Sequence, residues 1–256
     1  MISLKDKIAL VTGASSGIGA ATARAFAANG AKLILTARRQ ERLQQLAAEL
    51  QEQFHTETLL LTFDVRARES VISELSNLPL AWQAVDILVN NAGLSRGLSK
   101  LHEGSIDDWE EMIDANVKGL LYVTRTIVPG MVARGQGHVV NIGSIAGRAA
   151  YPGGNVYCAS KAAVRAISEG LKQDLLGTPV RVTDIQPGLV ETEFSIVRFH
   201  GDEQRAGKVY ENLTPLTAAD VADVVLFVVT RPPHVNISEL LLVPTDQATA
   251  TLVHRH

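Results

Sequence analysis

The stretch IALVTGASSGIG, residues 8–19, decides the fold class of this chain. Its first four residues form an unbroken apolar run, which is typical of a strand buried on both faces. Glycines then occupy positions 13, 17 and 19, and an alanine-rich helical segment follows. Glycines at such a junction allow a tight turn and a close approach of backbone N–H groups to a pyrophosphate at the helix N-terminus. A merely tight connection is the alternative, but the strand before, the helix after and a second strand near residue 35 favour a phosphate-binding turn.

Short apolar runs alternate with helical segments along the rest of the chain. The expected strands are residues 8–11, 33–35, 59–61, 87–89, 139–142, 180–185 and 240–243. The expected helices are residues 20–28, 41–53, 70–75, 109–133, 159–176 and 218–229. This alternation predicts a doubly wound, Rossmann-like α/β fold, with a central parallel sheet of about seven strands and helices on both faces. No repeat or linker divides the sequence, so we expect a single domain over residues 1–256, with a mainly cofactor-binding half, 1–95, and a catalytic and substrate half, 96–256.

The composition excludes several classes of function. The formal net charge of −3 over 256 residues gives no sign of a basic surface for nucleic acid or anionic lipid. No apolar run reaches the roughly 18 residues that a membrane span needs. The single cysteine, Cys158, cannot form an internal disulfide, and charged residues at 5–7 interrupt the region where a signal peptide would be apolar. We therefore expect a cytoplasmic protein that binds neither nucleic acid nor membrane.

The residues after the second strand indicate which nucleotide the turn would bind. A carboxylate there would bind the ribose 2′-hydroxyl of NAD and repel a 2′-phosphate. The sequence instead reads Thr36-Ala37-Arg38-Arg39, and guanidinium groups match the geometry of a phosphate. Both arginines could simply be solvated at a helix start, although cations at that end oppose the helix dipole. The pattern favours NADP(H) over NAD(H).

Tyr157 and Lys161 form a candidate acid–base pair. They stand four residues apart in a helical segment and therefore share one face of it. A free tyrosine titrates near pH 10, so proton exchange at neutral pH needs a pKa about three units lower, which a nearby ammonium and a nicotinamide cation would favour. Taken alone, such a pair is more often a surface contact.

Three polar residues strengthen the case for a site. Ser144 follows the strand at 139–142, and the carboxyl ends of parallel strands face the crevice where open α/β sheets bind ligands. Its hydroxyl could donate a hydrogen bond to a substrate oxygen as charge develops there. Asn90 similarly ends the fourth strand, and Asn116 lies in DANVKG, residues 114–119, although any one asparagine is a turn or cap residue by default.

Together these motifs resemble the short-chain dehydrogenase/reductase family over essentially the whole chain. The matching residues occur in family order, and they are Thr12 to Gly19, Asp64-Val65, Asn90 to Gly93, Asn116, Ser144, Tyr157, Lys161 and Pro187-Gly188. The resemblance implies that Tyr157 is the general acid in reduction and the general base in oxidation. It also implies that Lys161 holds the nicotinamide ribose and lowers the pKa of the tyrosine, and that Ser144 polarises the carbonyl. Asn116 would position a water in a proton relay from Lys161 to solvent.

The same resemblance implies a set of NADP(H) contacts. The candidate cofactor-binding residues are Thr12, Gly13, Ser15, Ser16, Gly17, Ile18, Gly19, Arg38, Arg39, Asp64, Val65, Asn90, Ala92, Gly93, Tyr157, Lys161, Pro187, Gly188, Val190 and Thr192. Within this set, Asp64 would contact the adenine and Asn90 the adenosine ribose region. The hydride chemistry would belong to the cofactor, while the protein would supply position and electrostatic field.

A narrower resemblance links the second half of the chain to NADP-dependent 3-hydroxy acid dehydrogenases. It rests on NVY at 155–157, VTDI at 182–185, PGLV at 187–190, TEF at 192–194, VRF at 197–199 and HVNI at 234–237. The resemblance implies oxidation of serine, allo-threonine or a 3-hydroxy acid, or reduction of malonic semialdehyde. The chain departs from these relatives at Glu191, where they tend to have glycine, and at Arg148-Ala149-Ala150, and we expect both departures to flank the substrate pocket.

A small anionic aldehyde or hydroxy acid needs a cationic anchor. Arg198 is the first candidate, because it lies in the segment expected to cover the nicotinamide. With Arg148 assisting it, the predicted substrate-binding set is Ser144, Arg148, Tyr157 and Arg198. A surface ion pair of Arg198 with Asp202 or Glu203 is the alternative. Two arginines would equally suit a sulfonate, so sulfoacetaldehyde reduction remains open.

Two other classes of function are weighed against this one. A regulator that senses NADP without turning it over should lack Tyr157, Lys161 or Ser144, and all three are present. A metal enzyme needs clustered ligands, whereas the seven histidines are scattered, so no metal is expected. The long helices carry apolar residues on more than one face, which burial against another subunit would explain. The family resemblance implies a homo-oligomer, a dimer or a tetramer, across whose interface the tail at 251–256 could pack.

Overall fold

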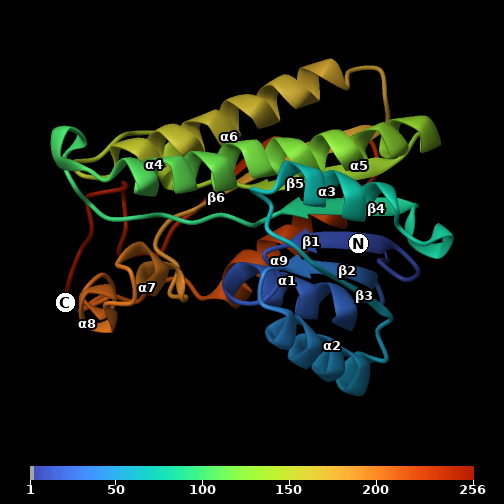
Figure 1. Ribbon diagram of the computed structural model, residues 1–256, viewed down its shortest axis with the longest axis horizontal. Helices are drawn as coiled ribbons and strands as arrows, with labels where there is room; N and C mark the ends of the chain where they lie inside the picture. The colour runs from blue at the N-terminus through green and yellow to red at the C-terminus, as the bar shows by residue number, and fades with distance from the viewer. Residues whose placement is uncertain (1–2) are drawn as a thin grey trace.

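The chain folds around a sheet of seven strands in the order β3-β2-β1-β4-β5-β6-β7. The computed structural model describes residues 3–256 (Figure 1). The strands are β1 Ile8–Thr12, β2 Lys32–Ala37, β3 Thr58–Thr62, β4 Val85–Asn90, β5 Gly137–Ile142, β6 Val180–Pro187 and β7 Glu239–Leu242. Every neighbouring pair runs parallel, and each of the seven predicted strands is observed. Met1 and Ile2, at the start of the N-terminal stretch considered for a signal peptide, lie outside the described residues.

The helices cover both faces of this sheet, which confirms the predicted doubly wound α/β fold (Figure 1). The helices are α1 Gly17–Ala28, α2 Gln40–Phe54, α3 Arg68–Ser76, α4 Ile106–Ile113, α5 Leu120–Arg134, α6 Asn155–Asp174, α7 Phe194–Arg198, α8 Glu203–Gly207 and α9 Ala218–Val229. Helices α1, α2 and α9 bury one apolar cluster against the sheet, and α3 and α5 bury a second cluster on the opposite face. Among the helices within residues 3–256, none combines the length and the hydrophobicity needed to cross a membrane.

One long helix expected at residues 109–133 is interrupted. It is observed as α4, a π-helical segment Asp114–Gly119, and α5. A π-helical turn holds an extra residue and is frequent at functional sites. Here the widened turn contains Asn116, whose side chain binds both backbone polar groups of Leu94 in the loop after β4. The interruption therefore buries the side chain of Asn116. The regular helix predicted from the sequence contained no such interruption.

The carboxyl ends of the strands form the functional edge of the sheet. Strand β1 pairs with β2 on one side and with β4 on the other, so the connections that follow β1 and β4 diverge and leave a crevice between them. The segment between β6 and α9 contains α7 and α8, which the sequence did not predict because five-residue helices show no clear periodicity. These two helices lie beside the C-terminal residues (Figure 1).

Candidate active site

A cleft of about 660 Å³ opens at this edge of the sheet. Its volume is in the range of about 300–1,000 Å³ that is typical of small-ligand sites. Most of the predicted site residues line it, namely Gly13, Ser15, Ser16, Gly17, Ile18, Arg38, Arg39, Asp64, Val65, Ala92, Gly93, Ser144, Tyr157, Lys161, Pro187, Gly188, Val190, Thr192 and Arg198. The fold thus brings residues from both halves of the chain to one surface.

The glycine-rich turn forms one end of the cleft. Gly13 has a φ of +66°, and a Cβ atom there would lie 2.9 Å from the Cα of Ala92, so a side chain at this position would collide with the backbone that follows β4. Gly17 starts α1 with a φ of +52° and faces the side chain of Thr192 from the segment after β6. The turn therefore keeps the N-terminus of α1 open toward the cleft, as an anionic group would require.

Three predicted cofactor contacts lie behind the cleft wall and do not reach it. The hydroxyl of Thr12 accepts hydrogen bonds from the N–H groups of Asn91 and Ala92, each at 3.0 Å, and holds the loop after β4. Gly19 packs against the carbonyl of Gly13 without room for a side chain. The amide of Asn90 donates to Thr124 and Asn141 between the sheet and the helices, so the expected contact with the adenosine ribose is corrected. These residues therefore support the cleft from behind its wall.

Asn116 also lies behind the wall, and its side chain is fully engaged. Its Oδ1 accepts from Leu94 N at 2.8 Å, while its Nδ2 donates to Leu94 O at 2.8 Å and to Ser160 Oγ at 2.9 Å. The amide therefore links the π-helical segment, the loop after β4 and α6. Ser160 precedes Lys161 on α6, so Asn116 holds the helix that carries the predicted lysine.

Two arginines project from the end of β2 into the cleft, and they differ in how many of their N–H groups already bind other residues. Arg39 donates to Ser16 Oγ at 2.8 Å and to Ser15 Oγ, and its NH1 binds Glu193 Oε2 at 2.9 Å. Arg38 is 55% exposed, and its nearest carboxylate within residues 3–256 is Asp64 at 3.7 Å. Arg38 is thus the guanidinium whose donors are available to a phosphate, whereas the sequence had predicted both arginines for this role without distinguishing them.

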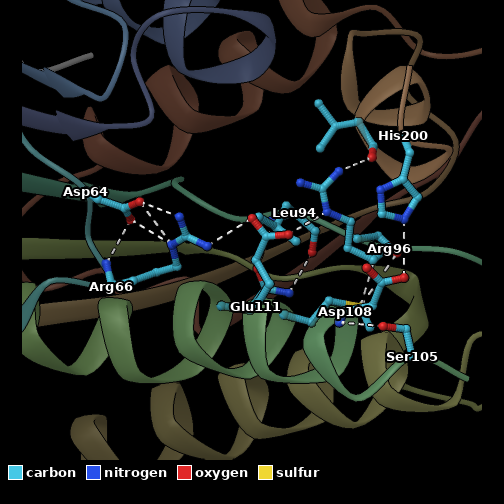
Figure 2. Close-up of polar contacts among 12 residues, drawn as sticks. Asp64, Arg66, Leu94, Arg96, Ser105, Asp108, Glu111 and His200 are labelled. Carbon is cyan, nitrogen blue, oxygen red and sulfur yellow. Dashed lines mark hydrogen bonds and ion pairs between the residues drawn. The ribbon is translucent and has the colours of Figure 1, made fainter. Parts of the chain in front are cut away.

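A chain of ion pairs runs from the end of β3 to α7 (Figure 2). Arg66 binds Asp64 at 2.7 Å and Glu111 at 2.9 Å, and Glu111 binds Arg96 at 2.6 Å. Arg96 in turn donates to the carbonyl of Val197 in α7. Burial alone would raise the pKa of Asp64, but hydrogen bonds from Arg66 hold that pKa below its usual value. The chain leaves Asp64 ionised at the cleft and fixes α7 relative to it.

Tyr157 and Lys161 lie on one face of α6 at the centre of the cleft, and both are buried. Burial raises the pKa of Tyr157 to about 12, and the charge of Arg198 and a hydrogen bond to Ser144 oppose this rise. Burial likewise lowers the pKa of Lys161 to about 8, against the charge of Asp184, and its Nζ donates to the carbonyl of Ile142 at 2.8 Å. Arg198 is thus a cation that opposes this rise, a role that the sequence did not predict for it, and the effect predicted for Lys161 stays a prediction.

Arg198 closes the cleft on the side of α7. Its Nε donates to Ser95 Oγ at 3.0 Å, and its NH2 donates to Tyr151 Oη at 3.3 Å. The guanidinium carbon lies 5.2 Å from the centre of the Tyr157 ring and 5.3 Å from that of Phe194. The alternative of a surface ion pair is not observed, since no carboxylate within residues 3–256 lies within ion-pair distance of this group.

The second predicted anchor and one predicted departure lie elsewhere. Arg148 binds Glu239 at 2.9 Å and also Gln186, and it does not line the cleft, so its expected place beside Arg198 is corrected. Glu191 is exposed and its N–H donates to Leu216 O; it does not line the cleft itself but lies between Val190 and Thr192, which do. The side chain of Arg148 points away because Glu239 and Gln186, on neighbouring strands, hold it.

The structure adds residues to the site that sequence reasoning missed. Tyr151, Phe194 and Gln247 line the cleft, and Ser95 holds Arg198. An aromatic residue in the loop YPGG, 151–154, between Ser144 and Tyr157 was an available signal. The tail also contributes, because Thr251, Val253 and Arg255 line the cleft and Arg255 donates to the carbonyl of Val209 at 3.1 Å. The tail thus packs on its own chain, and its place at a subunit interface stays a prediction.

Residues 7–202 match the family model of the short chain dehydrogenases. The chain therefore belongs to the short-chain dehydrogenase/reductase family and is an oxidoreductase. An NADP-dependent 3-hydroxy acid dehydrogenase of Salmonella typhi is 54% identical over 250 residues, covering 97% of this chain and 99% of that protein. A protein of the same name from Schizosaccharomyces pombe is 43% identical over 256 residues, covering 100% of this chain and 99% of that protein. The solved closed form of serine dehydrogenase complexed with NADP⁺ is 52% identical, with a TM-score of 0.92, and the match covers 97% of this chain and 100% of that one.

Proposed function

We propose that this chain is an NADP(H)-dependent dehydrogenase of small hydroxy acids, which also reduces the corresponding semialdehydes. The observation that carries the proposal is the guanidinium of Arg198, which has no carboxylate partner within residues 3–256 and lies beside Tyr157. A half-buried cation without a counter-ion at a catalytic centre is suited to an anionic substrate. The names of the 3-hydroxy acid and serine dehydrogenases among its relatives support the same substrate class.

The residues of the cleft fit NADP(H). The pyrophosphate would lie against the turn at Gly13 to Gly17, at the N-terminus of α1. The 2′-phosphate would bind Arg38, whose donors are available, and the neighbouring Arg39. The nicotinamide end would lie toward Tyr157, Lys161 and the segment after β6. NADP-dependent relatives support this choice of nucleotide.

The chemistry of the site follows from its hydroxyl groups and its ammonium. When bound, the nicotinamide would supply the hydride in reduction or take it up in oxidation. Tyr157 would give a proton from Oη to the carbonyl oxygen in reduction and take it back in oxidation. Ser144 would hold the substrate oxygen by a hydrogen bond, and Lys161 would hold the nucleotide ribose and reprotonate the tyrosine. Asn116 would keep α6 in place for this exchange through Ser160.

The carboxylate of the substrate would bind Arg198 and Tyr151. Arg198 keeps its NH1 group available while Ser95 and Tyr151 hold its other donors, so the plane of the guanidinium is set before the substrate arrives. Tyr151 supplies a hydroxyl next to it, and burial raises the pKa of this phenol, which keeps it a hydrogen-bond donor. A sulfonate presents the same charge, so sulfoacetaldehyde reduction is the second candidate function.

Substrate profiling tests the proposal. We expect kcat/KM for malonic semialdehyde, measured by NADPH absorbance, to exceed that for a neutral aldehyde of equal length, and Arg198→Ala to remove most of this preference. Sulfoacetaldehyde in the same panel distinguishes the two anionic substrates. An equal loss on the neutral and the anionic aldehyde would overturn the anchor. A protein that binds NADPH and turns over no aldehyde would instead be a nucleotide-sensing regulator.

We further propose that the chain works in the cytoplasm as a homo-oligomer, a dimer or a tetramer. Leu121 and Val132 of α5 and Leu241 of the edge strand β7 expose apolar side chains that a second copy could cover. Light scattering on the purified protein tests the oligomer, and a monomer at micromolar concentration would contradict it.

A further inference from the structure

Arg198 is held more firmly than an anchor for a carboxylate requires. Its backbone carbonyl accepts from the N–H of Gly97 at 2.8 Å, and the carbonyl before it accepts from Arg96. Figure 2 shows Arg96 between Glu111 and α7, with His200, two residues after α7, bound to Asp108. Contacts on both sides thus fix the end of α7, and with it the guanidinium over the ring of Tyr157.

The groups around Tyr157 show how much of its electrostatic environment depends on this arginine. Ser144 comes from the end of β5, Tyr151 from the loop before α6, Cys158 and Lys161 from α6, and Arg198 from α7. Tyr151 and Cys158 are neutral neighbours whose ionisation would disfavour a second negative charge. Lys161 directs its Nζ to the carbonyl of Ile142. Arg198 is therefore the cation packed against the phenol, at 5.2 Å from the ring centre, in a site from which burial excludes most water.

We propose that Arg198 is also a positioning residue for proton transfer: its charge favours the ionised form of Tyr157, and a substrate carboxylate bound to it reduces that effect. The inference rests on the proposed role of Tyr157 as the proton donor and acceptor. A cation beside a buried phenol stabilises the phenolate more than the phenol. When a carboxylate binds the guanidinium, part of this stabilisation is lost, so Tyr157 keeps its proton to higher pH. The charge of the substrate would thereby adjust the acidity of the group that protonates it.

The test compares two substrates with the same skeleton, 3-hydroxypropanoate and its neutral methyl ester, at saturating NADP⁺. Oxidation needs the phenolate, so the acidic limb of the kcat profile against pH, measured at saturating substrate, reports the ionisation of Tyr157 in the complex that holds both nucleotide and substrate. In the parent protein, we expect this limb to lie at higher pH for the acid than for the ester. In Arg198→Met, the limb for the ester should move up by about one pH unit, toward that for the acid. Arg198→Lys should restore most of the difference, since it keeps the charge.

Arg205→Met is the matched control. Arg205 lies 4.4 Å from the ring centre of Phe199, an equivalent contact outside the cleft, so its loss should leave both profiles unchanged. NADPH binding, followed by fluorescence, should be the same in all variants if they are folded. If the acidic limb for the ester is unchanged in Arg198→Met, the inference is overturned. If in that case KM rises for the acid alone, Arg198 still binds the substrate carboxylate but does not act on Tyr157. A shifted limb with equal KM effects on acid and ester would remove the anchor, and with it the part of the inference that assigns an effect to the substrate carboxylate.

Discussion

Glu193 and Arg39 face each other across the cleft, with Glu193 Oε2 2.9 Å from Arg39 NH1. Glu193 precedes α7, whereas Arg39 follows β2, and the same carboxylate also binds Arg42 of α2. Because Arg39 donates to Ser15 and Ser16 as well, one cluster joins the phosphate-binding turn to the segment that carries Arg198. Hydrogen bonds from Arg42 and Arg39 hold the pKa of Glu193 below its usual value, so the cluster stays ionised at neutral pH.

This cluster should retain the nucleotide. Glu193→Gln and Arg42→Met each remove one side of it, and we expect each to raise the NADPH dissociation rate about two- to fivefold, the range for partly exposed ion pairs. The double variant should be no faster than either single one, because both changes break the same contact. Stopped-flow NADPH fluorescence measures the rates. Arg24→Met, which breaks the surface pair with Glu49, is the control, and additive effects at 193 and 42 would contradict the prediction.

Arg38 should set the preference for NADP over NAD. Its guanidinium is the available phosphate donor at the end of β2, and a charge-assisted hydrogen bond contributes about 1.5–3 kcal/mol. Arg38→Ala should therefore lower the ratio of kcat/KM for NADP⁺ to that for NAD⁺ roughly tenfold or more. Arg68→Ala, which removes an exposed arginine paired with Glu69, should leave the ratio unchanged. The same ratio in Arg38→Ala and the parent would show that the 2′-phosphate binds elsewhere.

Tyr157→Phe should abolish turnover while sparing the nucleotide. The variant keeps the ring under Arg198 and removes only the hydroxyl, so kcat should fall by about 10²- to 10⁴-fold with NADPH affinity retained. Tyr151→Phe also removes only a phenol hydroxyl, in the loop before α6, and we expect it mainly to raise KM for the acid. Steady-state kinetics on both variants separate the two roles. A Tyr157→Phe enzyme as fast as its parent would refute the proton-transfer assignment.

His138 should make the protein less stable in acid. It is buried in β5 and bonded to Thr183 at 2.8 Å, and burial lowers its pKa from 6.5 to about 3. The unfolded chain binds a proton below about pH 6.5 while the folded protein does not, so this contribution to stability is complete above pH 6.5 and is lost progressively as the pH falls toward 3. Between about pH 7 and pH 5 the loss should be about 2 kcal/mol.

Urea unfolding at these two pH values measures the effect. His138→Gln should show a smaller decrease in the free energy of unfolding between them, because glutamine does not titrate. His234→Gln, at an exposed position, should retain the decrease of the parent. Equal pH dependence in His138→Gln and the parent would refute the assignment.

The local sequence pattern was enough to predict the strands, the glycine-rich turn and the face of α6 that carries the predicted acid–base pair. The apolar runs predicted the strands, and the run at residues 8–11 with its glycines predicted the turn before α1. Four-residue spacing placed Tyr157 and Lys161 on one face of α6, and a position just after β5 placed Ser144 at the carboxyl edge. These predictions succeed because strand period, helix period and the shared edge of parallel strands depend only on neighbouring residues and on chain direction.

In contrast, the hydrogen-bond and ion-pair partners of the side chains were decided by the packing of elements that are distant in sequence. Asn90 turns to Asn141 and Thr124 behind the cleft, and Arg148 turns to Glu239 on β7. Arg198 meets a tyrosine 41 positions earlier only because α7 packs against the first turn of α6. The physical reason is that a sequence pattern places a residue at an edge or on a face, whereas a hydrogen bond or an ion pair requires atoms within about 3–4 Å, and only tertiary packing sets distances of that size.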